Sequence, residues 1–337
     1  MKILYAIQGT GNGHISRAFE VIGHLKKYGE VDLLISGTQC DIKLPWKVKY
    51  RFHGMSFIFG KKGGVDLKET FLRSRPYEFL KEALTLPVYQ YDLVLNDFEP
   101  VSAWACKLRN VKCVGISHQS AVLHPQVPKP RTRDIVGKAI LKHYAPVSTA
   151  HGFHFKSIGQ TVSTPVIRDD IRWANNRNKG HYTVYLPSYS DDKIIQVLSQ
   201  FKNTKWHVFS KHTNTEYTAD NIDIKPVNKE KFTKSLVSGA GVLCNAGFET
   251  PAEALFLGKK LCVIPMKGQY EQHCNAAFLE SMGITTLNSF SKELERIQDW
   301  LDSKQPVQIK YPDNLADVID EIMANNIKAA CPELAVY

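Results

Sequence analysis

A glycine-rich segment near the amino terminus is the first place where residue types and spacing could do chemistry. Residues 9–14 read Gly-Thr-Gly-Asn-Gly-His, between an apolar run at 2–7 and a helical pattern at 14–28. Alternate glycines let the backbone turn sharply and aim N–H groups at an anion, and the positive end of the following helix adds to that attraction. The same positive end disfavours imidazolium, so His14 should stay neutral and able to accept a proton. A hydrogen bond that only holds the loop is the alternative role for His14.

Two common phosphate-binding patterns do not match this turn. A P-loop needs Gly-x-x-x-x-Gly-Lys-Ser/Thr, and the turn has no such lysine. A dinucleotide-binding turn needs an acid at the end of the second strand, but the run at 31–36 ends on Ser36 and has Asp32 near its start. A substrate loop at the mouth of a cleft and glycines that only form a turn both remain open.

A second pattern, at 244–258, reads Cys-Asn-Ala-Gly-Phe-Glu-Thr-Pro-Ala-Glu-Ala-Leu-Phe-Leu-Gly. Thr250 and Glu253 have the form of a capping box around Pro251, which predicts a helix that begins near Pro251. Helix-start chemistry alone accounts for both residues. The same helix N-terminus could instead hold a diphosphate, while Glu253 accepts both hydroxyl groups of a ribose.

A polar cluster follows the run at 261–264. Glu271 and Asn275 share one face of an expected helix, and Gln272 lies beside that face. Hydrogen-bond donors and acceptors in this arrangement suit a polyhydroxyl ligand.

The scaffold that positions these residues is expected to be α/β. A chain of 337 residues is about right for two domains, and short β-rich runs alternate with helical stretches, as in parallel sheets. A polar stretch at 175–180 marks the linker. We therefore predict two doubly wound Rossmann-like domains, 1–165 and 166–337, facing a central cleft, with a last helix at 314–326 that could pack back on the first domain. Ligands of such sheets lie outside the carboxyl ends of the strands.

The charge is divided unequally between the two halves. Residues 1–165 carry 23 Lys and Arg against 12 Asp and Glu, so the whole net charge of +10 arises there. An anionic partner (nucleic acid, an acidic membrane surface or a phosphorylated substrate) and a solubilising basic face are both consistent with this. The stretch 43–62 interleaves basic and aromatic residues, which would suit a membrane surface, single-stranded nucleic acid or an ordinary strand with one basic side.

Composition bounds the class of protein. Seven cysteines without a Cys-x-x-Cys argue against a disulfide framework and a structural zinc site. No apolar run approaches the ~18 residues of a membrane span, and the N-terminus lacks a signal-peptide pattern, so a cytoplasmic protein is expected.

Together the motifs resemble those of a known family. The turn at 9–14, with Asn245, Gly247, Thr250 and Glu253 and then Glu271 and Gln272, is similar to the two-domain GT-B glycosyltransferases, and among them to the lipid II-forming enzymes of glycosyltransferase family 28. The resemblance implies that a nucleotide sugar, UDP-linked, binds the second domain and that an acceptor binds the first. It also suggests a lipid-linked acceptor and peripheral contact of the basic first domain with the inner face of the cell envelope membrane. From the charge, an anionic acceptor is the other expectation, and we expect no nucleic acid as a partner.

Residue roles follow from the same resemblance. Glu253 would hold the donor ribose, while Glu271 and Gln272 would hold the sugar hydroxyl groups. The donor-side candidates are Ser188, Lys211, Asn245, Gly247, Phe248, Glu249, Thr250, Glu253, Glu271, Gln272 and Asn275. The acceptor-side candidates are Gly9, Thr10, Gly11, Asn12, Gly13, His118 and Gln119. The segment at 118–120 is one residue shorter than in the family, and position 271 is Glu where the lipid II enzyme has Gln.

The implied reaction is inverting displacement at the anomeric carbon. No Asp-x-Asp occurs in the chain, so we expect no metal and no cofactor; the helix near Pro251, with Ser188 and Lys211, would stabilise the leaving diphosphate. His14 is the first candidate base. Asp97 and Glu99 are the alternatives, unless they cap the helix around Pro100. The nucleobase is expected near 227–232.

Three other functions remain as alternatives. A nucleotide-sugar 2-epimerase of the same fold would convert its substrate without an acceptor. A non-catalytic sugar-nucleotide sensor would bind without turnover. A basic nucleic-acid binder would show strongly salt-dependent affinity for oligonucleotides.

Overall fold

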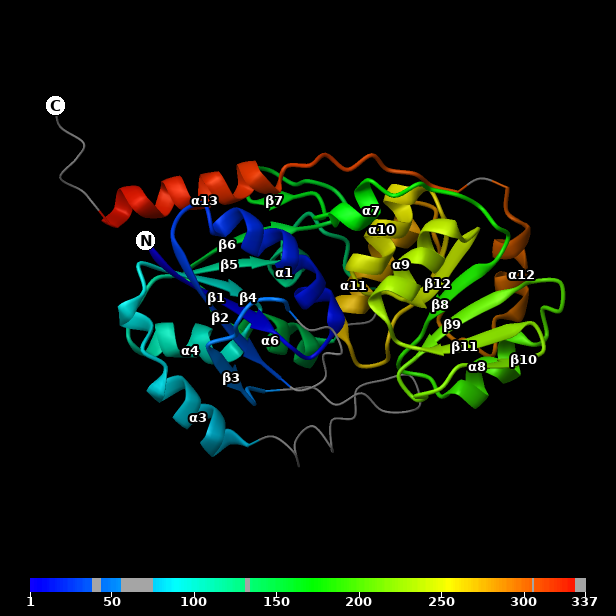
Figure 1. Cartoon of the computed structure of the whole chain (residues 1–337), viewed down its shortest axis with the longest axis horizontal. Helices are drawn as coiled ribbons and strands as arrows, with labels where there is room; N and C mark the ends of the chain where they lie inside the picture. The colour runs from blue at the N-terminus through cyan, green and yellow to red at the C-terminus, as the bar shows by residue number, and fades with distance from the viewer. Residues whose placement is uncertain (38–43, 56–74, 131–133, 305, 331–337) are drawn as a thin grey trace.

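The computed structural model describes residues 1–37, 44–55, 75–130, 134–304 and 306–330, with side chains described up to Asn326. Two α/β lobes lie side by side in Figure 1, each built on its own sheet. The predicted fold class, two doubly wound sheets in one chain, is confirmed.

The first sheet contains seven strands in the order β3-β2-β1-β4-β5-β6-β7, and each pair of neighbouring strands is parallel. The strands are β1 (Lys2–Gln8), β2 (Glu30–Ser36), β3 (Tyr50–Phe52), β4 (Leu93–Asp97), β5 (Cys113–Ser117), β6 (Thr149–Phe153) and β7 (Val162–Ser163). The order changes direction between β1 and β4, where a parallel sheet opens a crevice for ligands. The glycine-rich turn follows β1, and Asp97 ends β4, so both lie at this crevice.

Helices pack on both faces of the first sheet (Figure 1). They are α1 (Asn12–Leu25), α3 (Pro76–Thr85), a short 3₁₀ turn (Val88–Gln90), α4 (Pro100–Leu108), α5 (His118–Val122) and α6 (Ile135–His143). Alternate residues of β1 belong to different clusters: Ile3 and Ile7 pack with α1, whereas Leu4 and Ala6 pack with α4. This two-sided burial is why β1 reads as a continuous apolar run.

The second sheet repeats the architecture. Its order is β10-β11-β9-β8-β12-β13-β14, parallel except for the β10–β11 pair. The strands are β8 (Tyr182–Tyr185), β9 (Trp206–Ser210), β10 (Tyr217–Ala219), β11 (Ile222–Pro226), β12 (Gly241–Asn245), β13 (Lys260–Ile264) and β14 (Thr285–Thr286). The helices are α7 (Asp169–Arg172), α8 (Asp191–Leu198), α9 (Lys229–Ser238), α10 (Glu249–Leu257), α11 (Tyr270–Ser281), α12 (Leu294–Asp302) and α13 (Leu315–Ala330). The crevice of this sheet lies between β8 and β12, directly before α10.

The two lobes are connected at several places. The last helix, α13, returns to the first lobe and lies along α1, where Tyr28 donates a hydrogen bond to Asp320 (Figure 1). On the cleft side, Leu141 of α6 shares an apolar cluster with Tyr270 and Cys274 of α11. Among the described helices, none is long and apolar enough to cross a bilayer.

Candidate active site

A central cleft of about 1550 Å³ lies where the carboxyl ends of the two sheets face each other. Residues of the turn at 10–14 line it from the first lobe, and the start of α10 lines it from the second. It adjoins an N-side cavity of about 750 Å³, with which it shares His14, Gln119 and Glu271. It also adjoins a C-side cavity of about 640 Å³, with which it shares Asn12, Glu249 and Thr250. The three cavities therefore form one continuous site.

His14 lies at the junction of the central cleft and the N-side cavity. Its Nδ1 is 2.8 Å from Asp97 Oδ1, and Arg17 Nη2 donates to the same oxygen at 2.6 Å. Burial raises the pKa of Asp97, but the charges of Arg17 and His14 outweigh burial and hold that pKa below its ordinary value. A carboxylate at Nδ1 fixes the tautomer with hydrogen on Nδ1, which leaves the lone pair of Nε2 directed away from Asp97.

Arg17 connects the two lobes. It lies one turn after His14 on α1, it is buried, and it forms an ion pair with Glu249, the first residue of α10. Burial raises the pKa of Glu249 to about 7, although the Arg17 charge opposes that shift. A chain of charged contacts thus runs from His14 through Asp97 and Arg17 to the start of α10.

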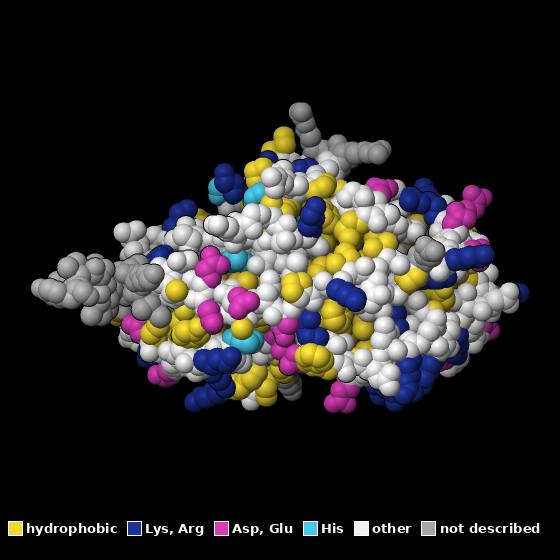
Figure 2. All heavy atoms as spheres, turned by 90° about the horizontal axis from the view of Figure 1, so that it is seen from above, with side chains coloured by type: hydrophobic (Ala, Val, Ile, Leu, Met, Phe, Trp, Pro, Cys, Tyr) yellow, Lys and Arg dark blue, Asp and Glu magenta, His cyan; other side chains and the backbone are white. Residues whose placement is uncertain are grey.

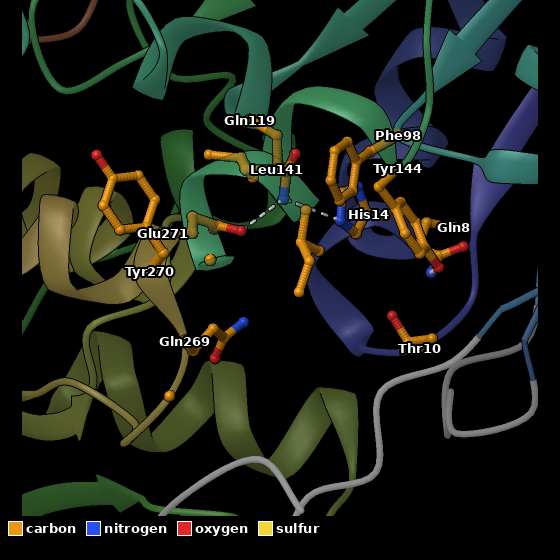
Figure 3. Close-up of a pocket in the computed structure, with 13 residues that line it drawn as sticks. Gln8, Thr10, His14, Phe98, Gln119, Leu141, Tyr144, Gln269, Tyr270 and Glu271 are labelled. Atoms are coloured by element: carbon orange, nitrogen blue, oxygen red, sulfur yellow. Dashed lines mark hydrogen bonds between the residues drawn. The ribbon is translucent and has the colours of Figure 1, made fainter. Parts of the chain in front are cut away.

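Gln119 links His14 to the second lobe. Its Nε2 donates to Glu271 Oε2 at 2.9 Å and lies 3.4 Å from His14 Nε2, as the dashed lines in Figure 3 show. Burial raises the pKa of Glu271 above its ordinary value. The base candidate, an amide and a carboxylate from two lobes therefore converge at one point.

Two helices begin at the central cleft. The N-cap of α1 is Gly11 and that of α10 is Phe248, and no described side chain caps either helix. The first N–H groups of a helix have no partner within the helix, and they carry its partial positive charge. Two such helix starts at one cleft make a site for an anion.

The comparisons with known proteins agree with this geometry. A family model described as "Glycosyl transferase family 1" matches residues 1–304. The chain belongs to this glycosyltransferase family. It is therefore an enzyme of glycosyl transfer. No curated protein sequence matched the chain.

Solved structures share the fold of this glycosyltransferase. MurG of Acinetobacter baumannii has a TM-score of 0.57 at 14% identity, covering 96% of this chain and 99% of that one. The glycosyltransferase SnogD of Streptomyces nogalater has a TM-score of 0.53 at 14% identity, with coverages of 97% and 99%. UGT89C1 of Arabidopsis thaliana, complexed with UDP, has a TM-score of 0.56 at 10% identity and covers 99% of each chain. The resemblance to GT-B glycosyltransferases is confirmed.

The predicted capping box of the glycosyltransferase does not form. Helix α10 begins at Glu249 rather than near Pro251, so Thr250 lies inside the helix. The Glu253 carboxylate turns instead to Arg168, whose Nε and Nη2 donate to its two oxygens at 2.6 and 3.0 Å. This pair lines the C-side cavity together with Tyr185, Val227 and Phe232.

Most donor-side candidates of the second lobe line the central cleft. They are Lys211, Asn245, Gly247, Phe248, Glu249, Thr250, Glu271 and Gln272. Ser188 is one layer deeper: its hydroxyl donates to Asn245 Oδ1 at 3.3 Å, and Asn245 Nδ2 donates to the Ile264 carbonyl. Ser188 therefore orients Asn245 and does not line the three cavities.

His118 and Asn275 form a buried contact between the lobes. His118 Nε2 lies 2.7 Å from Asn275 Oδ1, and the imidazole stacks on Phe248 with ring centroids 3.8 Å apart. Burial lowers the pKa of His118 to about 4. Asn275 is fully buried and lines none of the three cavities, so in this structure it supports the interface between the lobes, and its predicted contact with a ligand stays a prediction. His118 borders the central cleft, but both of its ring nitrogens already have protein partners.

The structure separates the three catalytic candidates. Glu99 is fully buried and caps α4, where its carboxylate accepts hydrogen bonds from the N–H groups of Val101 and Ser102. Asp97 is fully buried behind His14. His14 alone of the three lines the cavities. Glu99 takes the alternative role of a helix cap, Asp97 is a hydrogen-bond partner of His14, and the choice of catalytic base stays a prediction.

The residues of the glycine-rich turn also differ in whether they line the central cleft. Thr10, Gly11, Asn12 and Gly13 line the central cleft. Gly9 lies behind it and donates from its N–H to the Ser36 carbonyl at 2.7 Å.

Several residues that form the site were not predicted from the sequence. Arg17 was within reach, because it stands three residues after His14 and so shares its helical face. Arg168 and the α6 residues carry no local signal, since distant parts of the chain bring them to the site. Phe98 has a φ of 56°, a strained conformation for a side-chain-bearing residue, and its ring lies parallel to that of His14.

The predicted contact of the basic first lobe with an anionic partner stays a prediction. On the one face that Figure 2 shows, basic and acidic side chains are interspersed over the first lobe. Of the stretch 43–62, residues 43 and 56–62 lie outside the described residues. Within it, Trp46 packs on Phe19 beneath Lys26. In the described ranges, no group of three or more His, Cys, Asp or Glu could hold a metal.

Proposed function

We propose that this enzyme transfers a sugar from a nucleoside diphosphate sugar, UDP-linked, to an acceptor hydroxyl with inversion at the anomeric carbon. The observation that carries the proposal is the position of His14, where its Nε2 faces the junction between the central cleft and the N-side cavity. A donor in one cavity and an acceptor in the other would meet there.

The donor lies along the central cleft and the C-side cavity. Its nucleoside enters the C-side cavity, where Glu253, fixed by Arg168, accepts hydrogen bonds from the ribose hydroxyl groups. Its diphosphate lies at the starts of α1 and α10, where backbone N–H groups and the positive charge of Lys211 stabilise the negative charge of the phosphates. The UDP held by the Arabidopsis neighbour of this fold supports uridine as the nucleoside.

The reaction is a single displacement. His14 Nε2 takes the proton of the acceptor hydroxyl as the acceptor oxygen bonds to the anomeric carbon, and the bond from that carbon to the diphosphate oxygen breaks. Because the acceptor oxygen attacks from the side opposite the leaving group, the configuration at the anomeric carbon is inverted. Asp97 stabilises the imidazolium that forms, and general-base assistance of this kind is worth ~10²–10⁴-fold. The backbone N–H groups at the start of α10 stabilise the negative charge that develops on the leaving diphosphate.

A panel of UDP-sugars, incubated with the enzyme in EDTA with water as the surrogate acceptor for the sugar, tests the proposal. We expect one donor to release UDP, with His14→Ala slowing the release by ~10²-fold or more. His24→Ala, on the last turn of the same helix, is the matched control and should leave the rate unchanged. Conversion of the sugar without release of UDP would indicate an epimerase instead, and binding of UDP-sugars with no turnover would indicate a sensor.

A further inference from the structure

The loop between β9 and β10 brings a positive charge to the central cleft. Residues 211–216 belong to no helix or strand, and Lys211 and His212 at the start of this loop line the cleft. Pairing of β9 with β11 ends at Ser210, directly before the loop. Contacts other than sheet pairing must therefore fix the backbone that carries Lys211.

One carboxylate holds both ends of the β9–β10 loop. Asp191, the first residue of α8, accepts a hydrogen bond from the Ser210 hydroxyl on Oδ1 and one from the Tyr217 hydroxyl on Oδ2, the latter at 3.1 Å. Ser210 precedes the loop and Tyr217 follows it, so α8, β9 and β10 are tied at one point (Figure 1). Hydrogen bonds to an ionised carboxylate are roughly twice as strong as those between neutral groups.

The Ser210 hydroxyl extends this restraint into the loop. Its hydrogen goes to Asp191, while its oxygen accepts a hydrogen bond from the His212 N–H at 2.9 Å. On the other side, His212 Nε2 lies 3.3 Å from the Pro187 carbonyl oxygen, in the segment before α8. Lys211 thus stands between two anchored residues, and its side chain reaches the cleft from a fixed backbone.

The stability of α8 alone does not account for the orientation of Asp191. Asp191 and Asp192 both lie in the first turn of α8, where a negative charge favours the helix. Asp192 is exposed to solvent, whereas the Asp191 carboxylate turns towards β9 and β10. Burial and the charge of Asp191 raise the pKa of Tyr217 to about 12, so the Tyr217 hydroxyl keeps its proton and donates at neutral pH.

We propose that Asp191 is a positioning residue for the donor: it holds the β9–β10 loop so that Lys211 meets the diphosphate. This inference rests on the proposed function, which places the diphosphate in the central cleft. Asp191 lines none of the three cavities, so it acts through Ser210 and the loop. Without Asp191, the loop and the long Lys211 side chain would have to become ordered when the phosphates bind, and this loss of entropy opposes binding.

Calorimetric titration of the whole enzyme with UDP tests the proposal without turnover. In Asp191→Asn only one acceptor oxygen remains, so one of the two hydroxyl groups loses its partner, and UDP binding should weaken about tenfold. Asp192→Asn removes the same charge from the same turn of α8 and should leave the UDP affinity unchanged. Equal effects of the two variants, or no loss of affinity in Asp191→Asn, would overturn the proposal.

A double-mutant cycle separates positioning of Lys211 from a general weakening of the fold. Lys211→Met removes the charge that the loop presents, so adding Asp191→Asn to it should cause no further loss of UDP affinity. Additive losses would show that Asp191 does not act through Lys211 and would overturn the proposal.

A milder variant guards against misfolding of Asp191→Asn. Tyr217→Phe keeps the ring and removes one of the two hydrogen bonds, so it should cause a smaller loss of UDP affinity that also disappears in the Lys211→Met background. Near-ultraviolet circular dichroism checks that each variant is folded. An unchanged UDP affinity in folded Tyr217→Phe would contradict the anchoring of the loop by Asp191.

The outcomes also separate this proposal from the proposed function. UDP binding that depends on Asp191, in an enzyme that releases no UDP from any donor, would contradict the proposed transfer alone. Release of UDP by an enzyme whose UDP affinity does not depend on Asp191 would contradict the role of Asp191 alone. No binding of UDP by the wild type would contradict both.

Discussion

At the scale of single residues, His14 and Asp97 act as a pair. Asp97 is inaccessible, yet its charge fixes the His14 tautomer and would stabilise the imidazolium formed in the proposed reaction. Asp97→Asn keeps the shape and removes the charge, so we expect UDP release to slow by ~10²-fold or more while the UDP affinity changes little. Asp92→Asn, just before the same strand, is the control. Unchanged turnover in Asp97→Asn would show that His14 does not depend on this carboxylate.

Glu249 gives the site a pH dependence. Its folded pKa of about 7 exceeds its ordinary value of 4.5, so the folded protein binds a proton more readily than the unfolded chain. Stability from this group is therefore fully present below about pH 4.5 and is lost as pH rises to about 7. We expect the melting temperature of the wild type to fall relative to Glu249→Gln between pH 5 and 8. A constant difference would contradict the raised pKa.

When it is ionised, Glu249 should also weaken the proposed binding of the diphosphate, because the two negative charges repel each other. It stands at the start of α10, so its ionisation near pH 7 places a negative charge where the phosphates would bind. The affinity for UDP should therefore fall from pH 6 to 8 in the wild type and fall less in Glu249→Gln. Calorimetric titrations at the two pH values measure this, and parallel declines in both proteins would contradict it.

Sequence reasoning at this scale succeeded where the signal was local. The glycines and His14 stand within six residues of one another, so their spacing alone predicted a turn followed by a helix. The ion pair of Arg17 with Glu249 joins residues 232 positions apart. The capping box failed for the same reason: Arg168, 85 positions before Glu253, offers a charged partner stronger than a backbone N–H group.

At the scale of elements, the turn after β1 must pass close to β2. A Cβ on Gly9 would lie 2.8 Å from Ile35 Cγ2 and 2.9 Å from the Ser36 carbonyl oxygen, whereas a Cβ on Gly11 would meet nothing within 4 Å. Gly9→Ala should therefore lower the free energy of unfolding by ~1–3 kcal/mol, while Gly11→Ala changes it by less than ~0.5 kcal/mol. Urea denaturation measures both, and equal values would contradict the close approach.

Element types were predictable because the pattern of each segment is strong. Strands buried on both faces, such as β1, read as continuous apolar runs. The ends of the elements were less predictable than their types. Strands β10 and β7 are only three and two residues long, and the helix that was expected to begin at residue 14 begins at Asn12. That shift of two residues places His14 inside the first turn of α1, where it can meet Asp97.

At the scale of the whole molecule, the site exists only because two lobes meet. The Arg17–Glu249 pair, the Gln119–Glu271 hydrogen bond and the His118–Asn275 contact all cross the cleft. Alternation of strands and helices predicted two domains, but these contacts depend on how the domains are placed, which no local pattern encodes. The N-side cavity is likewise formed by segments far apart in the sequence.

The central claim is that the leaving diphosphate is stabilised by backbone N–H groups where α10 begins, facing the start of α1. A crystal structure of the enzyme grown with UDP and EDTA tests it most directly. The account predicts phosphates at residues 247–250, the ribose at Glu253 and the base beside Phe232. Phosphates bound elsewhere, or bound only when magnesium replaces EDTA, would contradict it.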